Sequence, residues 1–251
     1  MEIISIPNGT LEYVEVGDGV PLIMLHGGTG RIEEWGDCID YFATRYRVIA
    51  YNRRGYGNST PRDAFPPNFH IEDAHDLFAL LDHLALDSPV LLCGFSDGAT
   101  IALVFAAEFP ERVRAMVCSG GHIYMDDKTH KGLLRTRSLF EACIKRDELY
   151  EQSPQIRSQR AWFDLWLDPD FKRFSIEDKL HQIRCPALVI QGSEDEYAGA
   201  SHAHRIADGI EDSSLCLING AQHWIHGGKF AGEFKKKVMT FLGKFSKSPR
   251  F

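Results

Sequence analysis

The sequence of 251 residues predicts one domain of the α/β class, built on a mostly parallel central sheet. Short apolar runs alternate with amphipathic helical patterns along most of the chain, as in βαβ units. A hairpin signal near the N-terminus predicts an antiparallel start to the sheet. One long helical interval interrupts the alternation, and we interpret it as an insertion rather than a second domain.

The hairpin signal is Asn8-Gly9, which lies between the predicted strands Glu2–Ile6 and Thr10–Val16. Gly17-Asp18-Gly19 then provides a second turn. These two turns predict that the first strands pair antiparallel before the parallel part of the sheet begins.

Short apolar runs after this hairpin are typical of strands buried on both faces. The predicted strands are Leu22–Leu25, Val48–Tyr51, Val90–Cys93, Val113–Cys118, Ala187–Gln191 and Leu215–Ile218. Between them, Ile71 to Leu86 places apolar residues at spacings of three and four, which predicts an amphipathic helix. Ala99–Phe109 predicts another helix directly after the third of these runs.

The interval between Cys118 and Ala187 spans roughly 65 residues, too many for a single crossover. It contains two polar helical segments, Asp127–Arg146 and Gln155–Leu167. We therefore expect a single domain over residues 1–251 with a helical cap inserted at about 122–182. A last amphipathic helix is expected at Lys229–Phe245, with its lysines on the solvated face.

Composition excludes several classes of protein. Hydrophobic residues make up 44% and charged residues 25%, as in an ordinary globular domain. A net charge of −7 argues against nucleic acid as a partner, and no apolar run is long enough to span a membrane. The N-terminus lacks the pattern of a secretory signal, so we expect a cytoplasmic protein whose six cysteines are reduced and structural.

The segment Gly94-Phe95-Ser96-Asp97-Gly98 lies between a predicted strand and a predicted helix, the context that a G-x-S-x-G nucleophile elbow requires. A nucleophile on such a sharp turn needs small residues two positions before and after it, so that strand and helix can approach closely. Ser96 is therefore the candidate nucleophile. The alternative is an ordinary serine at a helix N-cap.

A serine nucleophile needs a histidine base and an acid that orients the base, expected here in the chain order Ser, acid, His. Asp195 and His223 each follow a predicted parallel strand, so both lie at the same sheet edge as Ser96. We therefore choose Asp195 as the orienting acid and His223 as the general base. The competing residues are Glu194, Glu196, Asp126 and Asp127 for the acid and His226 for the base.

Attack on a carbonyl creates an oxyanion, which backbone N–H groups must stabilise. The candidate donors are the amides of Asp97, directly after the nucleophile, and of Gly28 in His26-Gly27-Gly28-Thr29-Gly30. The alternative for that loop is a simple glycine-rich turn. No histidine pair has metal-ligand spacing backed by carboxylates or cysteines, and no nucleotide motif is present, so we expect neither a metal nor a cofactor.

Taken together, these residues resemble the α/β-hydrolase superfamily over almost the whole chain. The resemblance includes the turn Arg53-Arg54-Gly55-Tyr56-Gly57-Asn58-Ser59, although Asn52 stands where the superfamily usually has Asp and Gln222 where Gly is common. It implies a mostly parallel sheet with helices on both faces and a small variable cap. A serine at the elbow argues against the epoxide hydrolases and haloalkane dehalogenases, which use Asp there.

The elbow Gly-Phe-Ser-Asp-Gly and the segment Gly228–Phe234 resemble the valacyclovir hydrolase-like esterases. In those relatives the acid after the serine binds an ammonium group of the substrate, and the resemblance implies that Asp97 has this role here. The alternative is that Asp97 only complements the positive end of its helix. Tyr124, Trp162 and Trp166 are candidate substrate-binding residues of the cap, with core packing as the alternative role.

The predicted function is that of a serine hydrolase that cleaves a small-molecule carboxylic ester, including α-aminoacyl esters, through an acyl-enzyme. Two alternatives stay open on the same scaffold. One is a receptor that binds a small ligand without turnover, and the other is a C–C hydrolase or lyase that uses the same triad.

Overall fold

The computed structural model describes residues 1–144 and 152–246, and its central feature is one sheet in the order β1-β2-β4-β3-β5-β6-β7-β8. The antiparallel pairs are β1–β2 and β2–β4, and the remaining pairs are parallel. The strands are β1 (Glu2–Ile6), β2 (Gly9–Val16), β3 (Pro21–Leu25), β4 (Arg47–Asn52), β5 (Val90–Phe95), β6 (Val113–Ser119), β7 (Ala187–Gly192) and β8 (Ser213–Ile218). The predicted mostly parallel α/β fold is confirmed.

One detail of the hairpin differs from the prediction. Ile6 pairs with Gly9, so the two turn residues are Pro7 and Asn8 rather than Asn8 and Gly9. Gly9 has a φ of 138°, which glycine adopts readily, and its backbone lies against Thr60. The glycine is therefore used within the first strand pair rather than in the turn itself.

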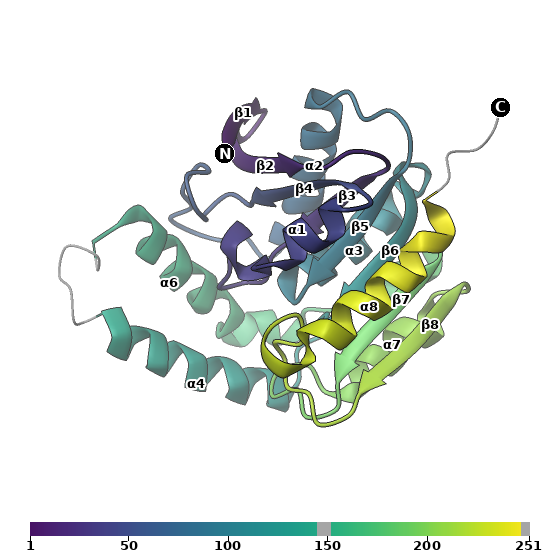
Figure 1. Cartoon of the computed structure of the whole chain (residues 1–251). Helices are drawn as coiled ribbons and strands as arrows, with labels where there is room; N and C mark the ends of the chain where they lie inside the picture. The colour runs from purple at the N-terminus through teal and green to yellow at the C-terminus, as the bar shows by residue number, and fades with distance from the viewer. Residues whose placement is uncertain (145–151, 247–251) are drawn as a thin grey trace.

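Helices cover both faces of the sheet (Figure 1). On one face lie α1 (Cys38–Ala43) and α8 (Ala231–Leu242), whose apolar residues join one side of the core. On the other face lie α2 (Phe69–His83), α3 (Asp97–Glu108) and α7 (Ala200–Gly209). The two apolar clusters explain why the inner parallel strands are buried on both sides. The edge strand β8 differs from the prediction, because its residues are mostly half-buried or exposed and Leu217 is 41% exposed.

Between β6 and β7 the chain forms α4 (Asp127–Ile144) and α6 (Pro154–Trp166). These two helices stand beside the sheet, next to the loops at the carboxyl ends of its parallel strands (Figure 1). They correspond to the two helices predicted within residues 122–182, although Arg146 of the first prediction lies outside the described residues. An aromatic cluster that includes Trp162, Phe163 and Trp166 packs this segment together. The interval continues through the short 3₁₀ helices η3 (Pro169–Arg173) and η4 (Glu177–Gln182).

The remaining elements are short. They are the 3₁₀ helices η1 (Ile32–Trp35), η2 (Pro110–Arg112), η5 (Gly228–Phe230) and η6 (Gly243–Phe245), of which η5 and η6 bracket α8 within the predicted last helix. All six cysteines are free, and four of them are buried. Across residues 1–144 and 152–246, none of the helices combines the length and the apolar character that crossing a membrane requires.

Candidate active site

Ser96 occupies a sharp turn between β5 and α3. Its φ of 54° and ψ of −121° lie outside the regions that non-glycine residues prefer. A side chain at Gly94 would collide with the backbone of Gly98, and one at Gly98 with the carbonyl of Leu25. The two glycines therefore have the steric role that the sequence predicts for a nucleophile elbow.

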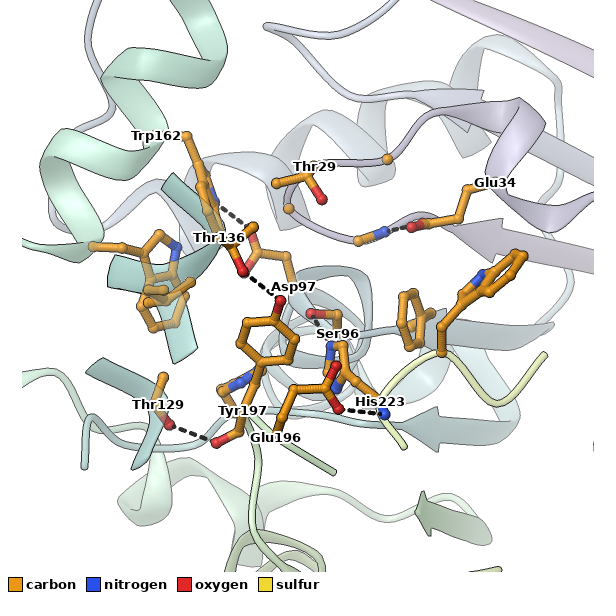
Figure 2. Close-up of a pocket in the computed structure, with 18 of the residues that line it drawn as sticks. Thr29, Glu34, Ser96, Asp97, Thr129, Thr136, Trp162, Glu196, Tyr197 and His223 are labelled. Atoms are coloured by element: carbon orange, nitrogen blue, oxygen red, sulfur yellow. Dashed lines mark hydrogen bonds between the residues drawn. The ribbon is translucent and has the colours of Figure 1, made fainter. Parts of the chain in front are cut away.

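The hydroxyl of Ser96 points to His223 instead of capping α3. The helix receives no side-chain cap from Ser96, and the Oγ atom lies 3.0 Å from Nε2 of His223 (Figure 2). The alternative role of a simple N-cap serine therefore does not describe this residue. Ser96 and a histidine base are within hydrogen-bond reach, as nucleophilic catalysis requires.

Asp195 lies on the other side of the His223 ring. Its Oδ2 atom is 2.6 Å from Nδ1 of His223, and its Oδ1 atom accepts the backbone N–H groups of Tyr197 and Ala198. Gln191 also donates to Oδ2 from the end of β7. Burial alone would raise the pKa of Asp195, but the charge and hydrogen bond of His223 outweigh it and the pKa lies below its ordinary value. Asp195 is therefore held as a carboxylate.

His223 is the group whose ionisation should control activity. Burial disfavours its charged form, but the Asp195 carboxylate and its hydrogen bond outweigh burial and raise the pKa of His223 above 6.5. We predict that kcat/KM falls as the pH decreases through this raised pKa, because only the neutral imidazole accepts the serine proton. A pH–rate profile with an acid limb whose midpoint lies below 6.5 would contradict this assignment.

The competing residues lie elsewhere or are engaged otherwise. Glu194 is exposed, while Glu196 accepts the backbone N–H of His223 at 3.1 Å. Asp126 accepts the N–H of Thr129 near the start of α4 and lies 3.4 Å from His202. Of these acids only Glu196 contacts His223, and it does so at the backbone, whereas Asp195 is the acid bonded to the imidazole ring.

His226, the competing base, packs between Trp35 and Phe95 and accepts a hydrogen bond from Trp224. Burial lowers its pKa to about 3. Its position gives it no contact with Ser96.

The residues that carry the candidate oxyanion donors, Gly28 in the loop after β3 and Asp97 at the start of α3, both line the cavity. Among the described residues, neither the amide of Gly28 nor that of Asp97 donates to a protein acceptor. The Gly28 carbonyl accepts from Tyr56 at 2.5 Å, and the Gly27 carbonyl accepts from Arg53 at 2.9 Å. These bonds fix the loop, so its amides are in place before a substrate binds.

Two further side chains hold the same loop. Glu34 accepts the N–H of Gly27 at 2.7 Å, and burial raises the pKa of Glu34 to about 7. The ring of His26 accepts the backbone N–H of Arg53 through Nε2 and lies 2.8 Å from the Gly27 carbonyl through Nδ1. The latter nitrogen therefore carries the proton of a neutral His26.

Asn52, which departs from the superfamily pattern, has a partner that supplies the missing carboxylate. Its amide donates to Glu12 on β2 at 2.7 Å, and Glu12 also accepts two hydrogen bonds from Asn58. The Asn52 side-chain oxygen accepts from the N–H of Ile32. Local hydrogen bonding at this turn is thus complete with Asn at position 52.

A cavity of about 550 Å³ lies between this sheet edge and the cap helices (Figure 2). It contains Ser96 and His223, and of the predicted substrate-binding residues it is lined by Asp97, Trp162 and Trp166. Tyr124 does not line it. The Tyr124 ring instead stacks on His202 at 4.0 Å and donates to Ser201, so the structure does not support a substrate contact for this residue.

Asp97 is 1% exposed and its carboxylate is already engaged. Trp162 donates to Oδ2 at 2.6 Å, Arg53 lies 3.6 Å from the same oxygen, and His70 lies 3.9 Å from Oδ1. Burial alone would raise the pKa of Asp97, but the neighbouring His70 and the charge of Arg53 outweigh it and lower the pKa. Asp97 therefore joins the cap helix α6 to the turn that carries Ser96.

Several residues that line the cavity were not predicted as site residues. They are Glu33, Glu34, His122, Thr129, Leu133, Thr136, Tyr197 and Trp224, together with Glu196, which was considered only as an acid. No short motif marks these positions. Tyr197 and Glu196, which directly follow Asp195, and Trp224, which follows His223, could have been found by their place next to the candidate residues. Thr129, Leu133 and Thr136 lie on the cap helix α4, for which the sequence contained no such signal.

Comparison with known proteins places this arrangement in a family. A family model described as the alpha/beta hydrolase fold matches residues 20–179. The chain belongs to this family. The mouse serine hydrolase BPHL is 30% identical to this alpha/beta hydrolase over 92% of the chain and 82% of the relative.

A second relative is the 2-hydroxy-6-oxo-6-(2'-aminophenyl)hexa-2,4-dienoic acid hydrolase of Metapseudomonas resinovorans, with 25% identity over 92% of this chain and 87% of the relative. Among solved structures, Est816, an N-acyl homoserine lactone degrading enzyme, has a TM-score of 0.79 at 23% identity and covers 96% of this chain and 100% of its own. The fold and a hydrolase activity follow from the family and its relatives. Among the described residues, no group of three or more His, Cys, Asp or Glu is placed to hold a metal ion.

Proposed function

We propose that this alpha/beta hydrolase cleaves carboxylic esters through an acyl-enzyme. The observation that carries the proposal is the continuous hydrogen-bonded chain from Ser96 through His223 to Asp195, with the serine hydroxyl facing a cavity. A hydroxyl is a weak nucleophile at neutral pH, and these hydrogen bonds would activate it by giving its proton an acceptor. A serine that only capped a helix would not need them.

In the first step the Ser96 oxygen attacks the ester carbonyl carbon while its proton passes to Nε2 of His223. The carbonyl oxygen becomes negative and is stabilised by the amides of Gly28 and Asp97. His223 then returns the proton to the leaving alkoxide, which departs as the alcohol. In the second step water attacks the acyl-enzyme, its proton passes to His223, and the acid is released as Ser96 is restored.

The charge of the cavity favours esters over the substrates of the C–C hydrolases. Four acidic residues line it, Glu33, Glu34, Asp97 and Glu196, against one arginine, Arg31. Glu34, with its pKa raised to about 7, is only partly ionised at neutral pH, so Glu33, Asp97 and Glu196 supply most of the negative charge. That arginine lies 3.6 Å from Glu33 and is mostly exposed. The dienoic acid in the name of the second relative is an anion at neutral pH, and this lining would repel it.

The same lining favours a substrate with a positive charge, which supports α-aminoacyl esters as the preferred class. We predict that wild-type kcat/KM for an aminoacyl ester exceeds that for its N-acetylated counterpart by roughly 10-fold, the low end for a charge-assisted contact because Arg53 already faces Asp97. Asp97→Asn keeps the backbone amide and an acceptor for Trp162, so this ratio should fall towards one. A ratio near one in the wild type would leave Asp97 as a structural acid and the activity as a general carboxylesterase.

Hydrolysis of short p-nitrophenyl esters tests the proposal. The acyl-enzyme mechanism predicts a burst of p-nitrophenol that does not exceed one equivalent per active site, followed by steady turnover, when deacylation is the slower step. A ligand that raises the melting temperature while no ester is turned over would favour the receptor alternative instead.

A further inference from the structure

The loop after β6 passes directly beneath the catalytic histidine. Gly120 has a φ of 64°, and a side chain there would place its first carbon 3.0 Å from Cε1 of His223. Two residues later, the backbone of His122 is clamped by Thr100, whose hydroxyl accepts the His122 N–H at 3.1 Å and donates to its carbonyl at 2.8 Å. The backbone position from which the His122 ring projects is therefore set by the fold.

The His122 ring borders the cavity beside the catalytic base. It is 5% exposed, and its centroid lies 5.7 Å from that of His223 and 5.8 Å from that of Trp166. Its Nδ1 atom is fully buried and has no hydrogen-bond partner among the described residues. Nε2 has no partner among them either, but it is not enclosed, so it is the ring nitrogen that reaches the cavity.

The protonation of this ring follows from its surroundings. Burial, together with the charges of His223 and His202, lowers the pKa of His122 to about 3, so the ring is neutral where the enzyme works. A neutral imidazole has one N–H donor and one acceptor. Burying an N–H with no acceptor is the costlier choice, so the lone pair lies at the enclosed Nδ1 and the proton at Nε2.

We propose that His122 is a specificity-determining residue whose Nε2–H donates a hydrogen bond to an uncharged oxygen of the substrate, a keto, hydroxyl or ether group near the scissile ester. An ammonium group has no lone pair to accept this bond, and the acidic lining disfavours a carboxylate. This inference rests on the proposed ester hydrolysis. It adds a second recognition point beside the one proposed for Asp97.

Substrates without such an oxygen leave the His122 donor unpaired once they displace water from the cavity. A site built around a hydrogen bond discriminates against the analogue that lacks the partner, and one uncharged bond corresponds to roughly 3- to 10-fold in kcat/KM. The expected preference is therefore modest, and matched substrates are needed to measure it.

Two substrate pairs of nearly equal shape provide the test. For the acyl side, p-nitrophenyl 4-oxopentanoate is compared with p-nitrophenyl 4-methylpentanoate. For the alcohol side, 2-methoxyethyl acetate is compared with butyl acetate. We expect the wild type to prefer the oxygen-bearing member of at least one pair by roughly 3- to 10-fold. His122→Phe keeps a ring without a donor and should remove that preference, whereas His122→Gln keeps an amide N–H near the Nε2 position and should retain part of it.

Equal kcat/KM values within both pairs for the wild type would overturn the role of His122, as would a preference that His122→Phe leaves intact. Because the ratio compares two substrates on one protein, a partly unfolded variant does not distort it. If the wild type hydrolyses none of the four esters, the proposed function itself fails, which is a different result from hydrolysis of all four without a preference.

Discussion

Replacing Ser96 by alanine is expected to lower kcat for p-nitrophenyl esters by on the order of 10⁶, the loss typical when a triad nucleophile is removed. Without the hydroxyl no acyl-enzyme forms, and the remaining rate comes from water attack assisted by the amides of Gly28 and Asp97. Steady-state hydrolysis measures the loss of kcat, and the p-nitrophenol burst reports whether an acyl-enzyme forms. In Ser96→Ala the burst should disappear.

The substitution removes one oxygen from a buried turn, and Ser96 makes no side-chain bond to its helix. The melting temperature of Ser96→Ala should therefore stay close to that of the wild type. A variant that melts normally and retains more than a hundredth of the turnover would show that another group performs the chemistry.

Asp195→Asn is expected to lower kcat by about 10⁴. Asp195 accepts a hydrogen bond from Nδ1 of His223, which leaves Nε2 free to take the serine proton. An asparagine amide can donate to Nδ1 instead, which moves the ring proton to Nε2 and blocks that step. Removal of the carboxylate also lowers the pKa of His223, so the acid limb of the residual activity should shift to lower pH.

Asp126→Asn is the matched control for this experiment. Asp126 is a nearby acid that accepts the N–H of Thr129, and asparagine can accept the same bond. The kcat of Asp126→Asn should stay within a few-fold of the wild-type value. Equal losses in the two variants would mean that loss of an acid near the sheet edge, rather than the orientation of His223, causes the effect.

The sequence was sufficient to predict that Ser96, Asp195 and His223 come together, because of a general property of parallel sheets. Ser96, Asp195 and His223 each follow a strand, and the carboxyl ends of parallel strands meet at one edge. The strand runs are apolar on both faces, which makes them visible without a structure. The hairpin turn shifted by one residue because local turn signals do not fix which residues of a glycine-containing segment pair.

The lining of the cavity was less predictable because it depends on side-chain direction in loops and cap helices. Tyr124 was expected in the cavity, but its ring stacks on His202 from α7 instead. The environment of Asp97 combines Arg53, His70 and Trp162, which are distant in sequence and approach only in the folded chain. No spacing rule connects them to the elbow.

Labelling with a fluorophosphonate probe tests the central claim, that Ser96 is an activated nucleophile, most directly. The probe phosphorus is attacked by the serine oxygen with loss of fluoride, and the adduct survives proteolysis and mass spectrometry. We predict a single adduct on the peptide that contains Gly94–Gly98, located on Ser96 and absent in Ser96→Ala. Folded wild-type protein that does not label, or that labels on a different residue, would contradict the account.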